Sequence, residues 1–368
     1  MNSLQIRLAL QQRVLPAYRA PFFDALAGVC ADGLSVFAGE PRQDEKIATS
    51  KELKSALYFP GVNHHFLGGG LYLCWQSGLL EWLESWQPDV LIVEANPRYL
   101  HTPAAVRWMH ARRRPVIGWG LGAREAEGLL PSLRQAVRRS FLRSFDALLA
   151  YSHQGAAQYA AAGFDPQRIY VAPNAVSSRP TEPPPPRPVD AGQPAVLFVG
   201  RLQARKRIDL LIQACAALPE QLQPRLWLVG DGPAQADLQE LAGKVYPQAQ
   251  FFGARYGPEL DALFRKADLF VLPGTGGLAV QQAMSFALPI IVAEGDGTQS
   301  DLVRLGNGWS IPAGSAAALL AALAEALSDL PRLRRMGLES YRIVEEEVNV
   351  ERMVEVFMQA VECVSREA

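Results

Sequence analysis

The segment from residue 195 to residue 312 constrains the fold of this 368-residue chain more than any other. Continuous apolar runs, typical of strands buried on both faces of a parallel sheet, alternate there with stretches of helical spacing. The apolar runs are 195–199, 226–229 and 269–272, and the helical stretches are 208–218 and 279–287. This alternation predicts an α/β domain with a parallel sheet.

Each predicted strand ends in a loop that favours an anion. The residues concerned are Gly200, Arg201 and Lys206 after the first strand, Gly230 after the second, and Gly276, Gly277 and Leu278 after the third. Ligands of open parallel sheets bind beyond the carboxyl ends of the strands. Cations, glycine-rich backbone and a helix N-terminus all attract phosphate there. The sequence therefore predicts a phosphate site, against the alternative of solvated charges and ordinary turns.

The order and spacing of these features resemble the C-terminal domain of the family-4 glycosyltransferases of the GT-B fold, the kind that assembles polysaccharides and glycolipids. The matching segments are 198–202, 209–212, 228–233, 267–273 and 288–292, and Pro173-Asn-Ala-Val176 resembles the end of that family's first domain. The resemblance implies an α/β protein with two Rossmann-like domains, whose parallel sheets face a central cleft. It also implies a C-terminal helix that crosses back to the first domain.

The expected domains follow from composition and from this resemblance. They are an N-terminal acceptor-binding domain over 1–178, a proline-rich linker over 179–194, a nucleotide-sugar-binding domain over 195–348, and a crossover helix over 349–368. Expected strands of the first domain are 6–10, 34–38, 90–93, 116–119, 147–151 and 169–172. The linker contains Pro183-Pro-Pro-Pro186, and proline extends a chain while donating no backbone hydrogen bond.

Two carboxylates of the family pattern are missing. Family members carry one glutamate that contacts the donor sugar and, eight positions later, another that contacts the ribose. Gly274 and Gln282 occupy those positions here. The amide of Gln282 can still accept a hydrogen bond from a ribose hydroxyl, whereas Gly274 offers no side chain. The resemblance thus implies nucleotide binding through Arg201 and Lys206 and leaves the donor-sugar contacts open.

Candidate residues of the first domain follow its predicted strands. Arg19 is expected either to contact the diphosphate or to close its loop structurally, while Glu94 is the candidate catalytic acid. Asn96 and His101 follow Glu94 along the same predicted edge. Trp119, between glycines, is expected either to stack on an acceptor sugar or to pack between domains.

Residues 133–145 form an expected amphipathic helix with arginines on its polar side. Residues 1–175 carry 18 basic and 14 acidic side chains, against 18 and 23 in the remainder. A basic amphipathic helix can lie on an anionic membrane surface. The alternative is a packed helix whose arginines are solvated.

Composition excludes several classes of protein. The four cysteines have neither disulfide nor zinc spacing, and a net charge of −1 argues against nucleic-acid binding. With no apolar run of eighteen residues and no signal peptide, the sequence predicts a cytoplasmic protein, with a peripheral position on the cytoplasmic face of the membrane as the alternative. No metal and no cofactor is expected besides the donor substrate.

The function implied is transfer of a sugar from a nucleotide diphosphate sugar to a glycan or lipid-linked acceptor, with retention and without a metal. This hexosyl transfer would serve surface polysaccharide or glycolipid assembly. The missing carboxylates favour one alternative, a non-catalytic nucleotide-sugar-binding partner subunit. A nucleotide-sugar epimerase on the same fold is another.

Overall fold

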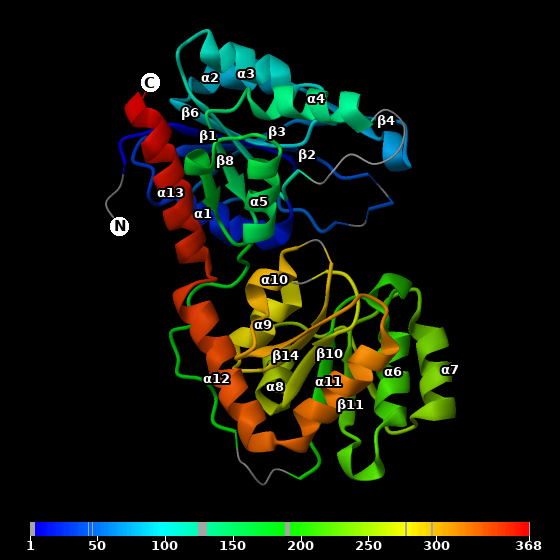
Figure 1. The fold of residues 1–368 in the computed structure, drawn as a ribbon. Coiled ribbons are helices and arrows are strands. Elements are labelled where there is room, and N and C mark those ends of the chain that lie inside the picture. The colour runs from blue at the N-terminus through cyan, green and yellow to red at the C-terminus, as the bar shows by residue number, and fades with distance from the viewer. Residues whose placement is uncertain are drawn as a thin grey trace. The chain divides into compact units, whose positions relative to one another are not determined.

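A computed structural model describes residues 4–42, 44–45, 47–123, 131–187, 192–276, 278–295 and 297–367. It divides the chain into two compact units (Figure 1). Unit 1 is Met1–Val176 together with Val350–Ala368, and unit 2 is Ser177–Asn349. The last helix therefore belongs to unit 1, as the resemblance implies.

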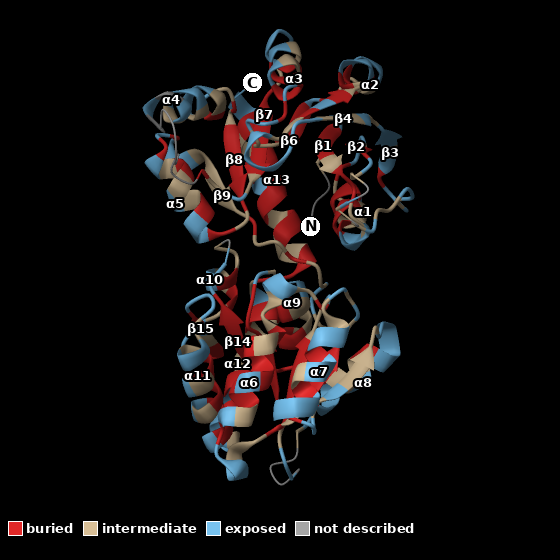
Figure 2. Ribbon diagram, turned by 90° about the vertical axis from the view of Figure 1, so that its right-hand side faces the viewer, coloured by how far each residue is buried: buried red, intermediate tan, exposed pale blue. Residues whose placement is uncertain are grey.

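Unit 1 contains a seven-stranded parallel sheet in the order β3-β2-β1-β6-β7-β8-β9. Its strands are β1 (Leu8–Val14), β2 (Leu34–Gly39), β3 (Leu57–Pro60), β6 (Val90–Glu94), β7 (Val116–Gly120), β8 (Ala147–Ala150) and β9 (Ile169–Val171). A separate antiparallel hairpin pairs β4 (Val62–Phe66) with β5 (Leu73–Ser77). The central strands are buried along most of their length, shown in red in Figure 2, because helices cover the sheet.

The helices of unit 1 fall between its strands, except the last. They are α1 (Ala20–Ala27), α2 (Leu79–Trp86), α3 (Thr102–His110), α4 (Pro131–Leu142), α5 (His153–Ala161) and α13 (Val350–Glu367). Helix α13 buries Met353, Phe357 and Val361 in the same apolar cluster as α1 and the first strands. Loss of this burial would expose large apolar side chains, so the terminal helix is part of the core of unit 1.

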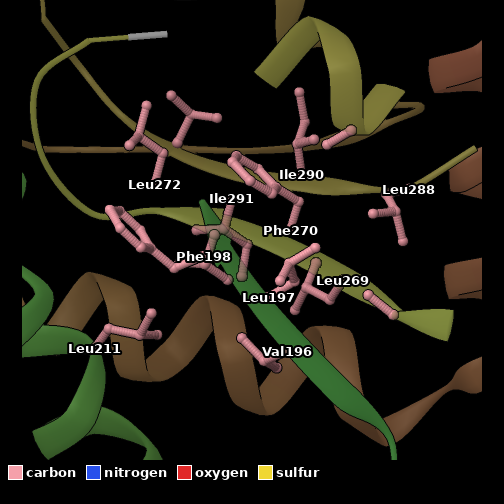
Figure 3. Packing of buried hydrophobic residues seen from close by; sticks show 14 of the residues in the cluster. Val196, Leu197, Phe198, Leu211, Leu269, Phe270, Leu272, Leu288, Ile290 and Ile291 are labelled. Carbon is pink, nitrogen blue, oxygen red and sulfur yellow. The ribbon is translucent and has the colours of Figure 1, made fainter. Parts of the chain in front are cut away.

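Unit 2 contains a six-stranded parallel sheet in the order β12-β11-β10-β13-β14-β15. Its strands are β10 (Ala195–Val199), β11 (Arg225–Val229), β12 (Gln250–Gly253), β13 (Leu269–Leu272), β14 (Ile290–Ala293) and β15 (Gly308–Ile311). Its helices are α6 (Ile208–Ala217), α7 (Gln235–Val245), α8 (Gly257–Lys266), α9 (Leu278–Ser285), α10 (Gln299–Leu302), α11 (Ala316–Ser328) and α12 (Leu330–Glu346). Figure 3 shows part of its core, where Leu197, Phe270 and Ile291 from three neighbouring strands pack together.

All nine strands expected from apolar runs are present, with small shifts of their ends. The largest shift is in β1, expected at 6–10 and found at Leu8–Val14, because Gln11, Gln12 and Arg13 continue the strand after the apolar run ends. The sequence analysis did not predict β3, β4, β5, β12, β14 and β15 as strands. All of these except β14 contain partly or fully exposed side chains and so lack continuous burial, whereas β14 is a buried run of only four residues.

The proline-rich segment groups with unit 2, and Arg187 anchors it there. The guanidinium of Arg187 donates hydrogen bonds to the carbonyl oxygens of Phe264 (3.1 Å), Arg265 (3.3 Å), Phe286 (2.6 Å) and Ala267. Three of these carbonyls lie at or just after the end of α8, where a helix leaves its last carbonyls without internal partners. One side chain of the segment thus caps a helix of the domain.

We expect Arg187→Ala to destabilise unit 2, because those carbonyls would lose their buried donor. The free energy of unfolding should fall by about 1–3 kcal/mol, measured in urea. Lys244→Ala is the matched control, since Lys244 is exposed and forms only a surface pair with Glu240; it should change stability by less than about 0.5 kcal/mol. Equal losses in the two variants would contradict the anchoring role.

Candidate functional site

The predicted anion-binding loops of unit 2 meet at the point where the strand order of its sheet reverses. Strand β10 lies between β11 and β13, so the connections from β10 and from β13 leave in opposite directions. Crevices at such reversal points are where open α/β sheets bind ligands. The loops concerned are residues 200–207 after β10 and residues 273–277 after β13.

Glycine lets the loop after β11 approach the loop after β10. A side chain on Gly230, where φ is 135°, would collide with the carbonyl oxygen of Gly200. The backbone N–H of Leu202 then donates to the carbonyl of Asp231 at 2.7 Å. Gly200 and Gly230 were predicted as binding residues. The structure shows that they let the two loops pack closely, and a contact with a ligand stays a prediction.

Lys206 brings the basic loop and the glycine-rich loop together. It ends a short 3-10 helix, Ala204–Lys206, and its ammonium occupies the space that a side chain on Gly276 would need. The neighbouring residues are also joined: Thr275 N–H donates to the Arg205 carbonyl at 3.1 Å, and Arg205 Nη1 donates to Thr275 Oγ1 at 3.2 Å. The predicted convergence of the two loops at one sheet edge is therefore confirmed.

The charge at this edge is positive. Burial and the neighbouring charge of Arg205 lower the pKa of Lys206 to about 8. Arg201 is exposed and forms no ion pair with any residue that the structure describes, whereas Arg207 pairs with Asp209 at 3.2 Å. An anion entering the site would find Arg201 and Lys206 without carboxylate partners.

Gly274 has no room for the family's glutamate in this loop conformation. A Cβ atom there would collide with the Arg205 carbonyl oxygen and lie 2.5 Å from the carbonyl carbon of Lys206. The backbone of the basic loop thus fills the space from which the missing carboxylate would extend. Sequence analysis identified the missing carboxylate but could not show that the neighbouring loop replaces it.

Gln282 lies in α9, the helix that follows the glycine-rich loop, and is half-buried. Its carbonyl accepts a hydrogen bond from Ser285 Oγ at 2.7 Å, and its side-chain amide has no hydrogen bond to the described part of the chain. Leu278 is 38% exposed at the first position of this helix. Gly277, also predicted as a binding residue, lies outside the described residues.

Glu94 lies at the corresponding reversal point of unit 1, where β1 is flanked by β2 and β6. Its carboxylate accepts a hydrogen bond from the backbone N–H of Arg13 at 2.7 Å. Burial raises the pKa of Glu94, and this effect outweighs the opposing influence of Arg13 and Arg19. The structure thus holds an acid with a raised pKa at this edge; its catalytic role stays a prediction.

His101, expected near Glu94, belongs to a buried polar network. Its Nδ1 accepts the backbone N–H of Gln76 at 3.0 Å, and its Nε2 lies 3.3 Å from the amide nitrogen of Gln11. Burial lowers the pKa of His101 to about 4, so the ring is neutral near pH 7. Gln11 in turn accepts the backbone N–H of Glu94 at 3.2 Å. The network therefore fixes the strand that carries Glu94.

Arg19 is buried among aromatic side chains. Its guanidinium carbon lies 4.5 Å from the ring centre of Trp119 and 5.1 Å from that of Tyr151, and its Nη2 donates to Tyr151 Oη at 3.0 Å. Cation–π contacts of this kind stabilise a buried guanidinium. This packing is what the structural alternative for Arg19 predicts, and a contact with the diphosphate stays a prediction.

Trp119 is a core residue of unit 1, so the expectation that it stacks on an acceptor sugar is wrong for this structure. It is 1% exposed and packs edge-on against Phe357 of α13, with ring centres 4.9 Å apart. The adjacent glycines also have packing roles. A side chain on Gly118 would lie 2.7 Å from Leu148, and one on Gly120 would lie 2.6 Å from the Tyr159 hydroxyl.

The predicted basic helix is α4, which ends at Leu142 and packs only in part against the core. Leu142 and, just beyond the helix, Phe145 are buried in the core of unit 1, whereas Val137 is 57% exposed. Arg139 and Arg143 line an open hollow of about 460 Å³ along this segment. The packed alternative therefore accounts for Leu142 and Phe145 but not for Val137, and Arg139 and Arg143 are exposed.

Sequence analysis missed Arg13, Thr275 and the glutamines of β1 as parts of the candidate site. Polar residues at the end of a buried strand were the available signal for Gln11 and Arg13. The described residues contain no group of three or more histidine, cysteine or acidic side chains placed to hold a metal ion. None of the described helices is both long and apolar enough to cross a membrane.

Two family models match successive parts of the chain. The model for glycosyl transferases group 1 matches residues 182–342, and that for the glycosyl transferase 4-like domain matches residues 55–175. The first therefore includes both loops of the unit 2 site. The second includes Glu94 and the helix α4.

Curated relatives resemble parts of the chain. A sulfoquinovosyl transferase of Arabidopsis thaliana is 37% identical over 28% of this chain, and a GDP-mannose-dependent alpha-mannosyltransferase of Mycobacterium tuberculosis is 36% identical over 33%. A D-inositol 3-phosphate glycosyltransferase of Nocardia farcinica is 26% identical over 77%. The alignments span only 20%, 31% and 62% of those proteins' own lengths.

Solved structures share the fold over nearly the whole chain. Anabaena HepE in complex with UDP has a TM-score of 0.67 at 17% identity, covering 99% of this chain and all of that one. The lipopolysaccharide outer core galactosyltransferase WaaB has a TM-score of 0.68 at 16% identity, covering 97% and 99%. The fold, the two family models and the paired loops agree: the chain belongs to the family-4 glycosyltransferases of the GT-B fold.

Proposed function

We propose that this protein transfers a sugar from a nucleotide diphosphate sugar to a glycan or lipid-linked acceptor in surface polysaccharide or glycolipid assembly. The observation that carries the proposal is the ammonium of Lys206 against Gly276, beside the uncompensated charge of Arg201. A diphosphate supplies the negative charge that this edge lacks, and backbone amides of a glycine-rich loop can approach it closely. Related proteins support the class of donor, since HepE is a UDP complex and the mannosyltransferases are named for GDP-mannose.

The proposed roles of the residues follow from their positions. Arg201 and Lys206 bind the diphosphate and offset the charge that develops on the leaving phosphate, aided by the N-terminus of α9. The side-chain oxygen of Gln282 accepts a hydrogen bond from a ribose hydroxyl, and Glu94 of unit 1 supplies an acidic group. Transfer with retention is part of this proposal. So is transfer without a metal, because cationic side chains and backbone amides would offset the negative charge of the diphosphate.

The experiment combines purified protein with a panel of nucleotide sugars and with glycan and lipid-linked acceptors. Transfer releases free nucleoside diphosphate only when an acceptor is present, and it lengthens that acceptor. Binding of a nucleotide sugar without any turnover would instead support a non-catalytic partner subunit. That second candidate is favoured by one observation, the packed backbone at Gly274 where the family's sugar-contacting carboxylate would begin.

Lys206→Ala should weaken nucleoside diphosphate binding by about ten- to a hundredfold in calorimetry, because a charge-assisted contact is lost. The parent affinity should also fall as the pH rises through about 8, since the lowered pKa of Lys206 leaves it neutral above that value. Between pH 7 and pH 9 the loss should be about tenfold. The alanine variant should lack this pH dependence, and a parent affinity that is constant over this range would exclude Lys206 as a ligand.

Gly274→Glu should not restore the family's donor contact. The new side chain collides with the Arg205 and Lys206 backbone, so we expect a stability loss of about 1–3 kcal/mol and weaker nucleoside diphosphate binding. Gly243→Glu is the control, because a side chain at that exposed helical position meets no atom within 4 Å. If Gly274→Glu were as stable as the control and bound nucleotide sugars more tightly than the parent, the packed loop could not be the binding conformation.

A further inference from the structure

The most unusual surface of unit 1 is formed by residues 55–80, which contain no aspartate, glutamate, lysine or arginine. This segment includes β3, the hairpin β4–β5 and α2's first residues. Eight large apolar side chains in it are exposed, which is about half of those exposed in the described chain. They are Leu57 (58%), Phe59 (39%), Val62 (59%), Phe66 (47%), Leu67 (68%), Leu71 (66%), Trp75 (41%) and Leu80 (41%).

The hairpin β4–β5 is held to unit 1 by polar side chains, while several of its apolar side chains are exposed. Apart from the buried Cys74, its inward contacts are polar: the amide of Asn63 donates to the Arg13 carbonyl at 2.7 Å, and the amide of Gln76 donates to Asn63 Oδ1 at 2.8 Å. Val62, Phe66 and Trp75 point outward instead. Burial in the core of unit 1 therefore does not explain these apolar residues, because the hairpin is attached through its polar face.

The tip of the hairpin stands clear of the rest of the structure. Side chains added at Gly68, Gly69 or Gly70 would meet no described atom within 4 Å. Leu67 has φ 58°, in the left-handed region, and Leu71 follows the glycines. Left-handed backbone is unfavourable for leucine, whereas glycine or asparagine adopts it more readily. An exposed leucine in this conformation needs a reason outside the fold of unit 1.

We propose that this hairpin inserts into the interface of a lipid bilayer, with Leu67 and Leu71 below the headgroups. The exposed tip carries apolar side chains without charge, as insertion requires, and Trp75 suits the boundary between headgroups and acyl chains. The segment 98–100 continues the hairpin's sheet through backbone bonds to Cys74. Arg98 there forms no ion pair in the described part of the chain and provides a cation for anionic headgroups. The surface is independent of sugar transfer and differs from α4, which would bind by charge alone.

The test is co-sedimentation of the full chain with vesicles of pure phosphatidylcholine and of phosphatidylcholine mixed with phosphatidylglycerol. Apolar insertion should persist on the neutral vesicles in about 1 M salt, where charge attraction is screened. The double variant Leu67→Asp with Leu71→Asp should lower the partition coefficient at least about tenfold on both vesicles. Trp75 gives a second readout, since its fluorescence should shift to the blue on binding and Trp75→Phe should remove that shift.

Two controls keep the outcome interpretable. Leu305→Asp places the same change at a side chain that is 98% exposed in unit 2 and should leave vesicle binding unchanged. The paired variant Arg139→Ala with Arg143→Ala should remove only the salt-sensitive part of the binding. Unchanged melting temperature and nucleoside diphosphate affinity in the tip variant would show that fold and donor site are intact.

Three results would overturn the proposal. The first is a parent protein that binds neither vesicle, and the second is a tip variant that binds vesicles as the parent does. The third is that same equal binding together with a parent that self-associates in analytical ultracentrifugation while its tip variant is monomeric. The apolar surface would then be an interface between copies of the chain.

Discussion

Close backbone contact between loops at one sheet edge is the constraint on which the candidate site depends. The loop after β10 packs against Gly230 on one side and against Gly274 on the other, with no side chain between them. This contact places the ammonium of Lys206 against Gly276, and Arg201 of the same loop is exposed. Because loop contacts of this density tolerate little extra volume, the packing that shapes the candidate site leaves no room for a glutamate side chain at position 274.

The two sheets share one strand order but use the reversal point differently. In unit 2 the loop after β10 presents Arg201 and Lys206, which form no ion pair with any described residue, whereas Arg207 pairs with Asp209. In unit 1 the corresponding groups are satisfied internally: Arg19 is enclosed by Trp119 and Tyr151, and Glu94 accepts from the backbone of Arg13. Unit 2 therefore holds uncompensated positive charge at this point, whereas unit 1 holds a carboxyl group, Glu94, whose pKa is raised by burial.

Surface chemistry of unit 1 is divided between two elements. Helix α4 buries Leu142 but exposes Val137 together with Arg139, and attraction of its arginines to anionic headgroups would depend on salt. The hairpin β4–β5 contains no lysine or arginine; Asn63 and Gln76 attach it through polar bonds, and Val62, Phe66 and Trp75 are exposed. Attraction of the α4 arginines to a membrane would rest on charge, whereas insertion of the hairpin would rest on apolar burial. Added salt should therefore weaken the first and not the second.

The sequence by itself determined the α/β class, nine of the strands and the loops that carry Lys206 and Gly276, because apolar runs and glycine placement are local signals. It could not determine which side chains those loops leave free. Arg19 and Trp119 looked available in the sequence, yet Trp119 and Tyr151 enclose Arg19, and Trp119 packs against Phe357 of α13. In the hairpin β4–β5, the apolar residues likewise do not reveal from the sequence that they are exposed. Whether an apolar residue faces a core or the solvent depends on which elements cover it, and only the tertiary structure decides that.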